Sequence, residues 1–170
     1  MADWDDVRRI ALSLPEATEQ PMHGVPSWRV RKKLFVWERP LRASELEALG
    51  ESAPSGPILG ARVEHLVAKE ALLADDPEVY FTTPHFDGYP SVLVQLERIG
   101  VKELEELVIE AWLTRAPKRL AKQYLDANPS KHDPPSMLKH VRTAVLEMAK
   151  HHIGMFGSAG RAGALSASAG

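Results

Sequence analysis

The sequence contains no cysteine. This absence excludes disulfide bonds, thiolate nucleophiles and the zinc or iron–sulfur sites that depend on cysteine ligands. It suits a reducing compartment. No apolar run approaches the roughly 20 residues that a membrane-spanning helix requires. Residues 1–6, MADWDD, are acidic, whereas a secretory signal begins with basic and then apolar residues. We therefore expect a cytoplasmic protein without a membrane segment.

Catalytic motifs are also absent. The chain has no Walker loop, no GxGxxG following a strand and no nucleophile elbow. Its seven histidines lack the spacing of metal ligands. His151 and His152, for example, are neighbours and would point about 100° apart on a helix. We expect a non-enzymatic protein with no catalytic residues, no metal and no cofactor.

What the chain does contain is an ordinary globular composition. Of its 170 residues, 44% are hydrophobic and 26% are charged, which predicts one domain with a core of its own. The formal net charge is −2. A surface that binds nucleic acid must therefore be a local patch.

The first half of the chain predicts a helix, a hairpin and a second, short helix. The first helix runs from Trp4 to Leu14, with Asp3 as its cap and Pro15 at its end. Residues 21–26 are expected to form a loop. Strands over residues 27–31 and 34–37 should form a hairpin with Lys32 and Lys33 at its tip, and a short helix over residues 44–49 should be capped by Ser44 with Glu47.

The second half predicts further strands and helices. We expect a strand over residues 58–63, a helix over 67–73, paired strands over 79–83 and 92–96, a long helix over 101–114, and a helix from Pro117 to about Leu125. This order indicates an α+β fold, an antiparallel sheet with helices packed on one face. The expected domain covers residues 1–126. A linker and amphipathic helix (127–153, with the helix from Met137 to His152) and a disordered Gly/Ala/Ser tail (154–170) form a C-terminal extension.

Two clusters of basic residues are the main candidates for function. One is at the expected hairpin: Arg29, Arg31, Lys32 and Lys33. The other repeats at i, i+3, i+4 and i+7 and forms one helical stripe: Arg115, Lys118, Arg119 and Lys122. Together they fit a site that binds phosphates. The alternative is that they complement a helix dipole and form solvated faces.

The loop over residues 84–90 carries three aromatic rings. His85, Phe86 and Tyr89 suit stacking on a base or lining a small-ligand pocket. The alternative is that they pack the end of the adjacent strand pair.

Several segments resemble the MmcQ/YjbR family. They are LSLPE (12–16), HGVPSWRV (23–30), DPEVYFTTPHF (76–86) and APKRL (116–120), and the resemblance covers about Trp4 to Leu125. The resemblance implies a compact α+β domain similar to secretion-chaperone-like and frataxin-like layouts. It also implies DNA binding through a "double wing", here the Arg29–Lys33 hairpin and the His85–Tyr89 loop, and it brings no catalytic residues.

Three functions follow as hypotheses. The first is binding of double-stranded DNA through Arg29, Arg31, Lys32, Lys33, His85, Tyr89, Arg115, Lys118, Arg119 and Lys122. The second is a chaperone-like module that binds a protein partner, a peptide or itself, with a surface covered by the C-terminal helix. The third is a small-ligand domain with a pocket near His23, Trp28 and His85.

Overall fold

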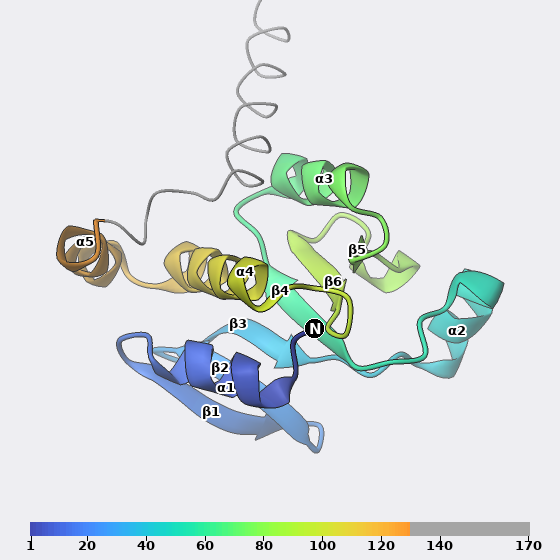
Figure 1. The fold of residues 1–170 in the computed structure, drawn as a ribbon, viewed down its shortest axis with the longest axis horizontal. Coiled ribbons are helices and arrows are strands. Elements are labelled where there is room, and N and C mark those ends of the chain that lie inside the picture. Colours follow the sequence, from blue (N-terminus) through green and yellow to red (C-terminus); the bar gives the residue numbers. More distant parts are fainter. Residues whose placement is uncertain (130–170) are drawn as a thin grey trace, which may run out of the picture.

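A six-stranded antiparallel sheet is the framework of the computed structural model, which describes residues 1–129. Its strand order is β1-β2-β3-β4-β6-β5 (Figure 1). The strands are β1 (Ala17–Met22), β2 (Val25–Val30), β3 (Lys33–Glu38), β4 (Ile58–Arg62), β5 (Tyr80–Phe81) and β6 (Ser91–Gln95). The expected α+β fold with an antiparallel sheet is confirmed.

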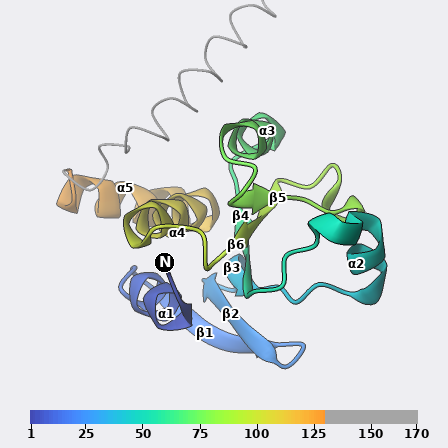
Figure 2. The same cartoon turned by 45° about the vertical axis from the view of Figure 1, so that its right-hand side comes forward.

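Two helices cover one face of this sheet. They are α1 (Trp4–Leu12) and α4 (Val101–Arg115), which contact each other and lie side by side in Figures 1 and 2. The remaining helices are α2 (Ala43–Leu49), α3 (Leu66–Asp75), α5 (Lys118–Ala127) and the short 3-10 turns η1 (Gly50–Ser52) and η2 (Pro84–Phe86). Within residues 1–129, no helix is long and apolar enough to cross a membrane.

The predicted apolar stripe of α4 forms the centre of the core. Leu104, Leu107, Val108, Ala111 and Trp112 are all buried, against a sheet face that includes Trp28 and Phe35. The indole Nε1 of Trp112 donates a hydrogen bond to the Pro15 carbonyl at 3.1 Å. That bond ties α4 to the end of the first helix, so α1, α4 and the sheet form one packed unit.

Strand β1 was not predicted from the sequence, and the prediction of a loop over residues 21–26 is wrong. These residues complete β1, form a tight turn at His23 and Gly24 (φ 53° and 81°) and begin β2. The strand is an edge with mostly exposed side chains, so it carries no apolar alternation to detect. Pro21 is tolerated there because the backbone N–H that proline lacks is not needed for pairing on the free side of an edge strand.

The hairpin between β2 and β3 is confirmed, with its turn one residue earlier than expected. Arg31 and Lys32 form the turn with φ of 44° and 71°, and Lys33 already belongs to β3. Both turn residues therefore adopt the left-handed conformation that glycine or asparagine prefers.

A β-bulge in this hairpin decides which side chains share a face. Trp28 pairs with Val36, whereas the next residue, Arg29, pairs with Leu34, so Phe35 is the extra residue of β3. In a regular strand Leu34 and Trp37 would point to opposite faces, because they are three residues apart. The bulge places both on the face that α1 and α4 do not cover, and Phe35 in the core.

The expected cap of the short helix is wrong. Helix α2 begins at Ala43, after its N-cap Arg42. The backbone N–H of Arg42 donates a hydrogen bond to the Glu45 carboxylate at 2.8 Å. Ser44 and Glu47 do not form a capping box. The other predicted elements agree with the structure to within a few residues, and β5 pairs with β6 as expected. The helix expected from Met137 to His152 and the tail after residue 154 lie outside the described residues.

Candidate functional site

The candidate site is on the sheet face opposite α1 and α4, called here the open face. Cross-strand partners point to the same side of a sheet, so the register identifies its members. Arg29 pairs with Leu34, Trp37 pairs with Gly60, and Gly60 pairs with Leu93. Two residues along β4, Arg62 pairs with Ser91 and also belongs to this face.

Trp37 is the central side chain of the open face, and it lies across β4 at Gly60. A Cβ atom added at Gly60 would be 2.3 Å from Cε2 of the Trp37 ring, far inside van der Waals contact. Only glycine at position 60 lets the indole lie flat on the neighbouring strand. Phe86, from η2, packs against the same ring with centroids 6.4 Å apart.

The loop that carries Phe86 is held by a buried lysine of α3. Lys69 is 5% exposed, and its Nζ donates to the Phe86 carbonyl at 2.6 Å and to the Tyr89 carbonyl at 3.1 Å. Burial lowers the pKa of the Lys69 ammonium, and the nearby charge of Asp87 partly opposes this effect. This loop is therefore fixed by hydrogen bonds to α3.

A buried ion pair fixes the other side of the same region. Arg39, just after β3, is 2.6 Å from Glu45 of α2, and Thr83 donates to the same carboxylate oxygen at 3.2 Å. Burial raises the pKa of Glu45, but the Arg42 N–H and the Arg39 charge outweigh burial and lower it. The Arg39 guanidinium also lies 5.2 Å from the centre of the Phe86 ring. The carboxylate therefore joins β3, α2 and the loop before η2.

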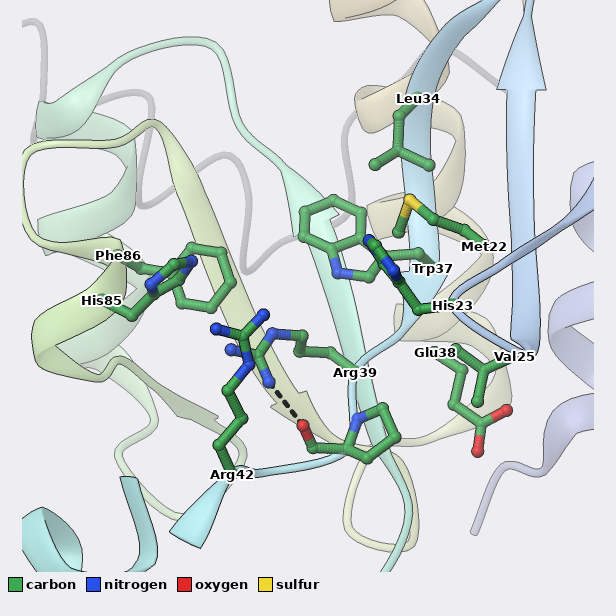
Figure 3. Close-up of a pocket in the computed structure, with 11 residues that line it drawn as sticks. Met22, His23, Val25, Leu34, Trp37, Glu38, Arg39, Arg42, His85 and Phe86 are labelled. Carbon is green, nitrogen blue, oxygen red and sulfur yellow. Dashed lines mark hydrogen bonds between the residues drawn. The ribbon is translucent and has the colours of Figure 1, made fainter. Parts of the chain in front are cut away.

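Two adjoining hollows lie on the open face, beside the loop held by Lys69 and the Arg39–Glu45 ion pair. The first, of about 370 Å³, is shown in Figure 3, where Phe86 and His85 lie on one side of Arg39, and Trp37, Leu34, Met22 and His23 lie on the other. The second, of about 380 Å³, is lined by Leu34, Trp37, Arg62, His85, Phe86, Tyr89, Ser91 and Arg115. Four residues line both hollows: Leu34, Trp37, His85 and Phe86. The open face thus carries one aromatic depression with arginines around it.

The structure brings three of the predicted binding residues together. His85, Tyr89 and Arg115 all line the second hollow. Arg29 lies beside the first hollow, because its guanidinium contacts the sulfur of Met22 at 3.5 Å. The pocket expected near His23, Trp28 and His85 exists for the two histidines, but Trp28 is fully buried in the core against Trp4. Trp37 occupies the place expected for Trp28.

The remaining predicted cations are exposed. Arg31 forms a surface ion pair with Glu16 at 3.0 Å. No carboxylate among residues 1–129 lies within ion-pair distance of the other five: Lys32, Lys33, Lys118, Arg119 and Lys122. Their positive charges are therefore not neutralised by direct pairs in the described part of the chain.

The two basic clusters meet at one end of the sheet. Strand β3 begins at Lys33, directly after the hairpin turn, and the antiparallel strand β4 ends at Arg62 near the same point. Arg115, the last residue of α4, lines a hollow with Leu34 and Arg62. Helix α5 begins three residues later. The basic stripe therefore starts at the sheet end that carries the hairpin turn.

Sequence reasoning missed Arg62, Trp37 and Leu34. Arg62 is an isolated cation at the end of a predicted strand, and only the strand register and the end of α4 place it beside Arg115. Among residues 1–129, no group of three His, Asp or Glu side chains is arranged to hold a metal ion.

Comparison with known proteins identifies the family. The YjbR family model matches residues 12–114, which include both hairpin strands, the aromatic loop and most of α4. The chain belongs to the YjbR family. This confirms the MmcQ/YjbR resemblance found in the sequence.

Relatives of this YjbR domain occur in mycobacteria. Uncharacterized protein Rv2570 of Mycobacterium tuberculosis and uncharacterized protein Mb2600 of Mycobacterium bovis are each 57% identical to this chain over 128 residues. The match covers 74% of this chain and 97% of each relative. The crystal structure of Deinococcus radiodurans protein DR2400, a DUF419 domain, is similar in fold, with a TM-score of 0.50 and 18% identity over 66% of this chain and 78% of that one.

Proposed function

We propose that this YjbR-family protein binds double-stranded DNA without catalysis, through the sheet end where the two basic clusters meet. The observation that carries the proposal is that Arg115 lines one hollow with Leu34, which places the start of the α5 stripe beside the β2–β3 hairpin. The resemblance to a family proposed to bind DNA through two wings also supports it. His85 and Tyr89, in the loop that the resemblance implies as a second wing, line the same hollow as Arg115.

Charge is the physical basis of this proposal. Lys32 and Lys33 project from the hairpin, and Lys118, Arg119 and Lys122 project from α5, all exposed. Phosphate contacts from such side chains release counterions, so affinity falls steeply as salt rises. With roughly six contacts, affinity should fall on the order of a thousandfold between about 50 and 200 mM salt.

The test compares two charge-reversal variants of equal net charge. The site variant is Lys118→Glu with Arg119→Glu, and the control is Arg98→Glu with Lys102→Glu. Lys102 lies near the start of α4 and about 20 Å along the helix from Arg115. Binding of a labelled DNA duplex by fluorescence anisotropy should be lost in the site variant and kept in the control. Equal binding by both variants, or binding that is independent of salt, would rule the proposal out.

A further inference from the structure

Arg62 and Arg115 form an unusual pair in the second hollow. Each side chain is half-buried, and each Nε is buried with no hydrogen-bond partner among residues 1–129. Burial lowers the pKa of the Arg62 guanidinium, and the positive charge of Arg115 lowers it further. Two cations are thus held close together in a partly desolvated place.

Nothing in the described part of the chain compensates for this arrangement. No carboxylate of residues 1–129 forms an ion pair with either arginine. Within residues 1–129, the only hydrogen bond from the pair runs from Arg62 Nη1 to Ser91 Oγ, at a long 3.4 Å. A buried donor without a partner costs about 1–3 kcal/mol, and like charges at short range add to that cost. The site is therefore complementary to an anion.

We propose that Arg62 and Arg115 bind the phosphate group of a small phosphomonoester, whose aromatic ring lies in the adjoining part of the depression beside Trp37 and Phe86. Guanidinium groups present paired donors that match phosphate oxygens, and two of them match a dianion in charge. The Ser91 hydroxyl, on a residue 3% exposed, is a further donor beside them.

The aromatic side chains that line the depression indicate the second half of the ligand, a flat ring. Trp37, Phe86, His85 and Tyr89 line the second hollow together with the two arginines. Hollows of about 380 and 370 Å³ are within the range of small-ligand pockets, roughly 300–1,000 Å³. A ligand with one phosphate and one flat ring, the nucleotide class, satisfies both the cations and the aromatic walls. Inorganic phosphate alone would leave the aromatic walls unused.

This inference goes beyond DNA binding and does not depend on it. Arg115, His85 and Tyr89 belong to both proposed sites. Lys118, Arg119 and Lys122 of α5 do not line the hollow, and Arg62 is not among the proposed DNA-binding residues. Failure of one proposal is therefore distinguishable from failure of the other. Duplex binding that is lost in the α5 variant while mononucleotide binding persists would separate the two sites.

The experiment is a calorimetric titration of the full-length chain with 2′-deoxyadenosine 5′-monophosphate. The parallel arms are deoxyadenosine, which lacks the phosphate, and inorganic phosphate, which lacks the ring. We expect the monophosphate to bind more tightly than either arm, and phosphate to compete with it. Arg62→Gln and Arg115→Gln should each weaken the monophosphate by at least about tenfold, because hydrogen bonds to charged groups contribute that much. Arg98→Gln, whose side chain is exposed near Glu78, is the matched control and should bind normally.

Three results of the titration would overturn the inference. They are no heat of binding at millimolar monophosphate, equal affinity for deoxyadenosine, or unchanged affinity in both glutamine variants. Thermal unfolding without ligand gives a second readout. Arg62→Gln removes a repulsive charge, so its Tm at low salt should equal or exceed that of the unmodified protein. A large fall in Tm would show that the arginine holds the fold together, and would contradict the proposal.

Discussion

Substitution of Gly60 by alanine tests how the open face is built. The new Cβ would lie 2.3 Å from Cε2, 2.6 Å from Cζ2 and 2.7 Å from Nε1 of Trp37. Ordinary carbon contacts begin near 3.5 Å, so the indole would have to move by more than about 1 Å. Trp37 is 5% exposed and is confined by Phe86. A shift of the ring away from Gly60 would therefore disturb its contact with Phe86.

The expected cost follows from overpacking. Forcing extra atoms into a packed region costs about 1–3 kcal/mol, and alanine recovers roughly 0.5–1 kcal/mol because it is less flexible than glycine in a strand. We expect Gly60→Ala to lower the free energy of unfolding in urea by about 1–1.5 kcal/mol, the overpacking cost less the gain from alanine. Gly100→Ala is the control. A Cβ there meets no atom within 4 Å, and the loss of glycine at this N-cap should cost below about 1 kcal/mol.

A double-mutant cycle identifies the cause. Trp37→Leu removes the ring and is destabilising alone, but in its presence the clash is gone and Gly60→Ala should stabilise the protein by roughly 0.5 kcal/mol. A coupling of about 1.5–2 kcal/mol is expected. Additive effects of the two substitutions would refute the steric explanation, as would an alanine variant as stable as the parent.

Three further changes test other features. Lys32→Gly should stabilise the protein by about 0.5–1 kcal/mol, because it relieves a left-handed turn residue, whereas Lys33→Gly in β3 should destabilise it; urea unfolding measures both. Tyr80, whose hydroxyl donates to Glu103 at 2.7 Å, has its pKa raised far above 10 by burial and by that carboxylate. The stability that the protonated Tyr80 hydroxyl contributes is fully present below pH 10 and is lost as pH rises further. We therefore expect Tyr80→Phe to be less stable than the unmodified protein by about 1 kcal/mol at neutral pH, but less sensitive to alkali when unfolding is measured against pH. Lys69→Met should lower stability by about 1–3 kcal/mol and speed proteolysis within residues 84–89, since two carbonyls lose their donor; unchanged proteolysis would contradict this account.

Elements with a strong apolar pattern were predictable from the sequence. The predicted stripe of α4, five residues at helical spacing, is buried throughout, and the paired strands β5 and β6 are rich in β-branched and aromatic side chains. Strand β1 was not predictable, because its side chains are mostly exposed and it is held by backbone pairing with β2, which leaves no apolar pattern in the sequence.

The site was predictable only in part. His85, Tyr89 and Arg115 were identified as polar or aromatic residues in a loop and at a helix end. Arg62 was not, because its closeness to Arg115 depends on where β4 and α4 end relative to each other. The choice between Trp28 and Trp37 depends on one extra residue in β3, which no periodicity in a short strand reveals.

The carboxylate of Glu45 has a consequence for the shape of the depression. It joins Arg39, which continues the strand of Trp37, to Thr83, which immediately precedes the turn carrying Phe86. The two aromatic walls are thus spaced by a residue that is 4% exposed and lines neither hollow. A mutational survey confined to the visible lining would miss the side chain that sets the width of the opening.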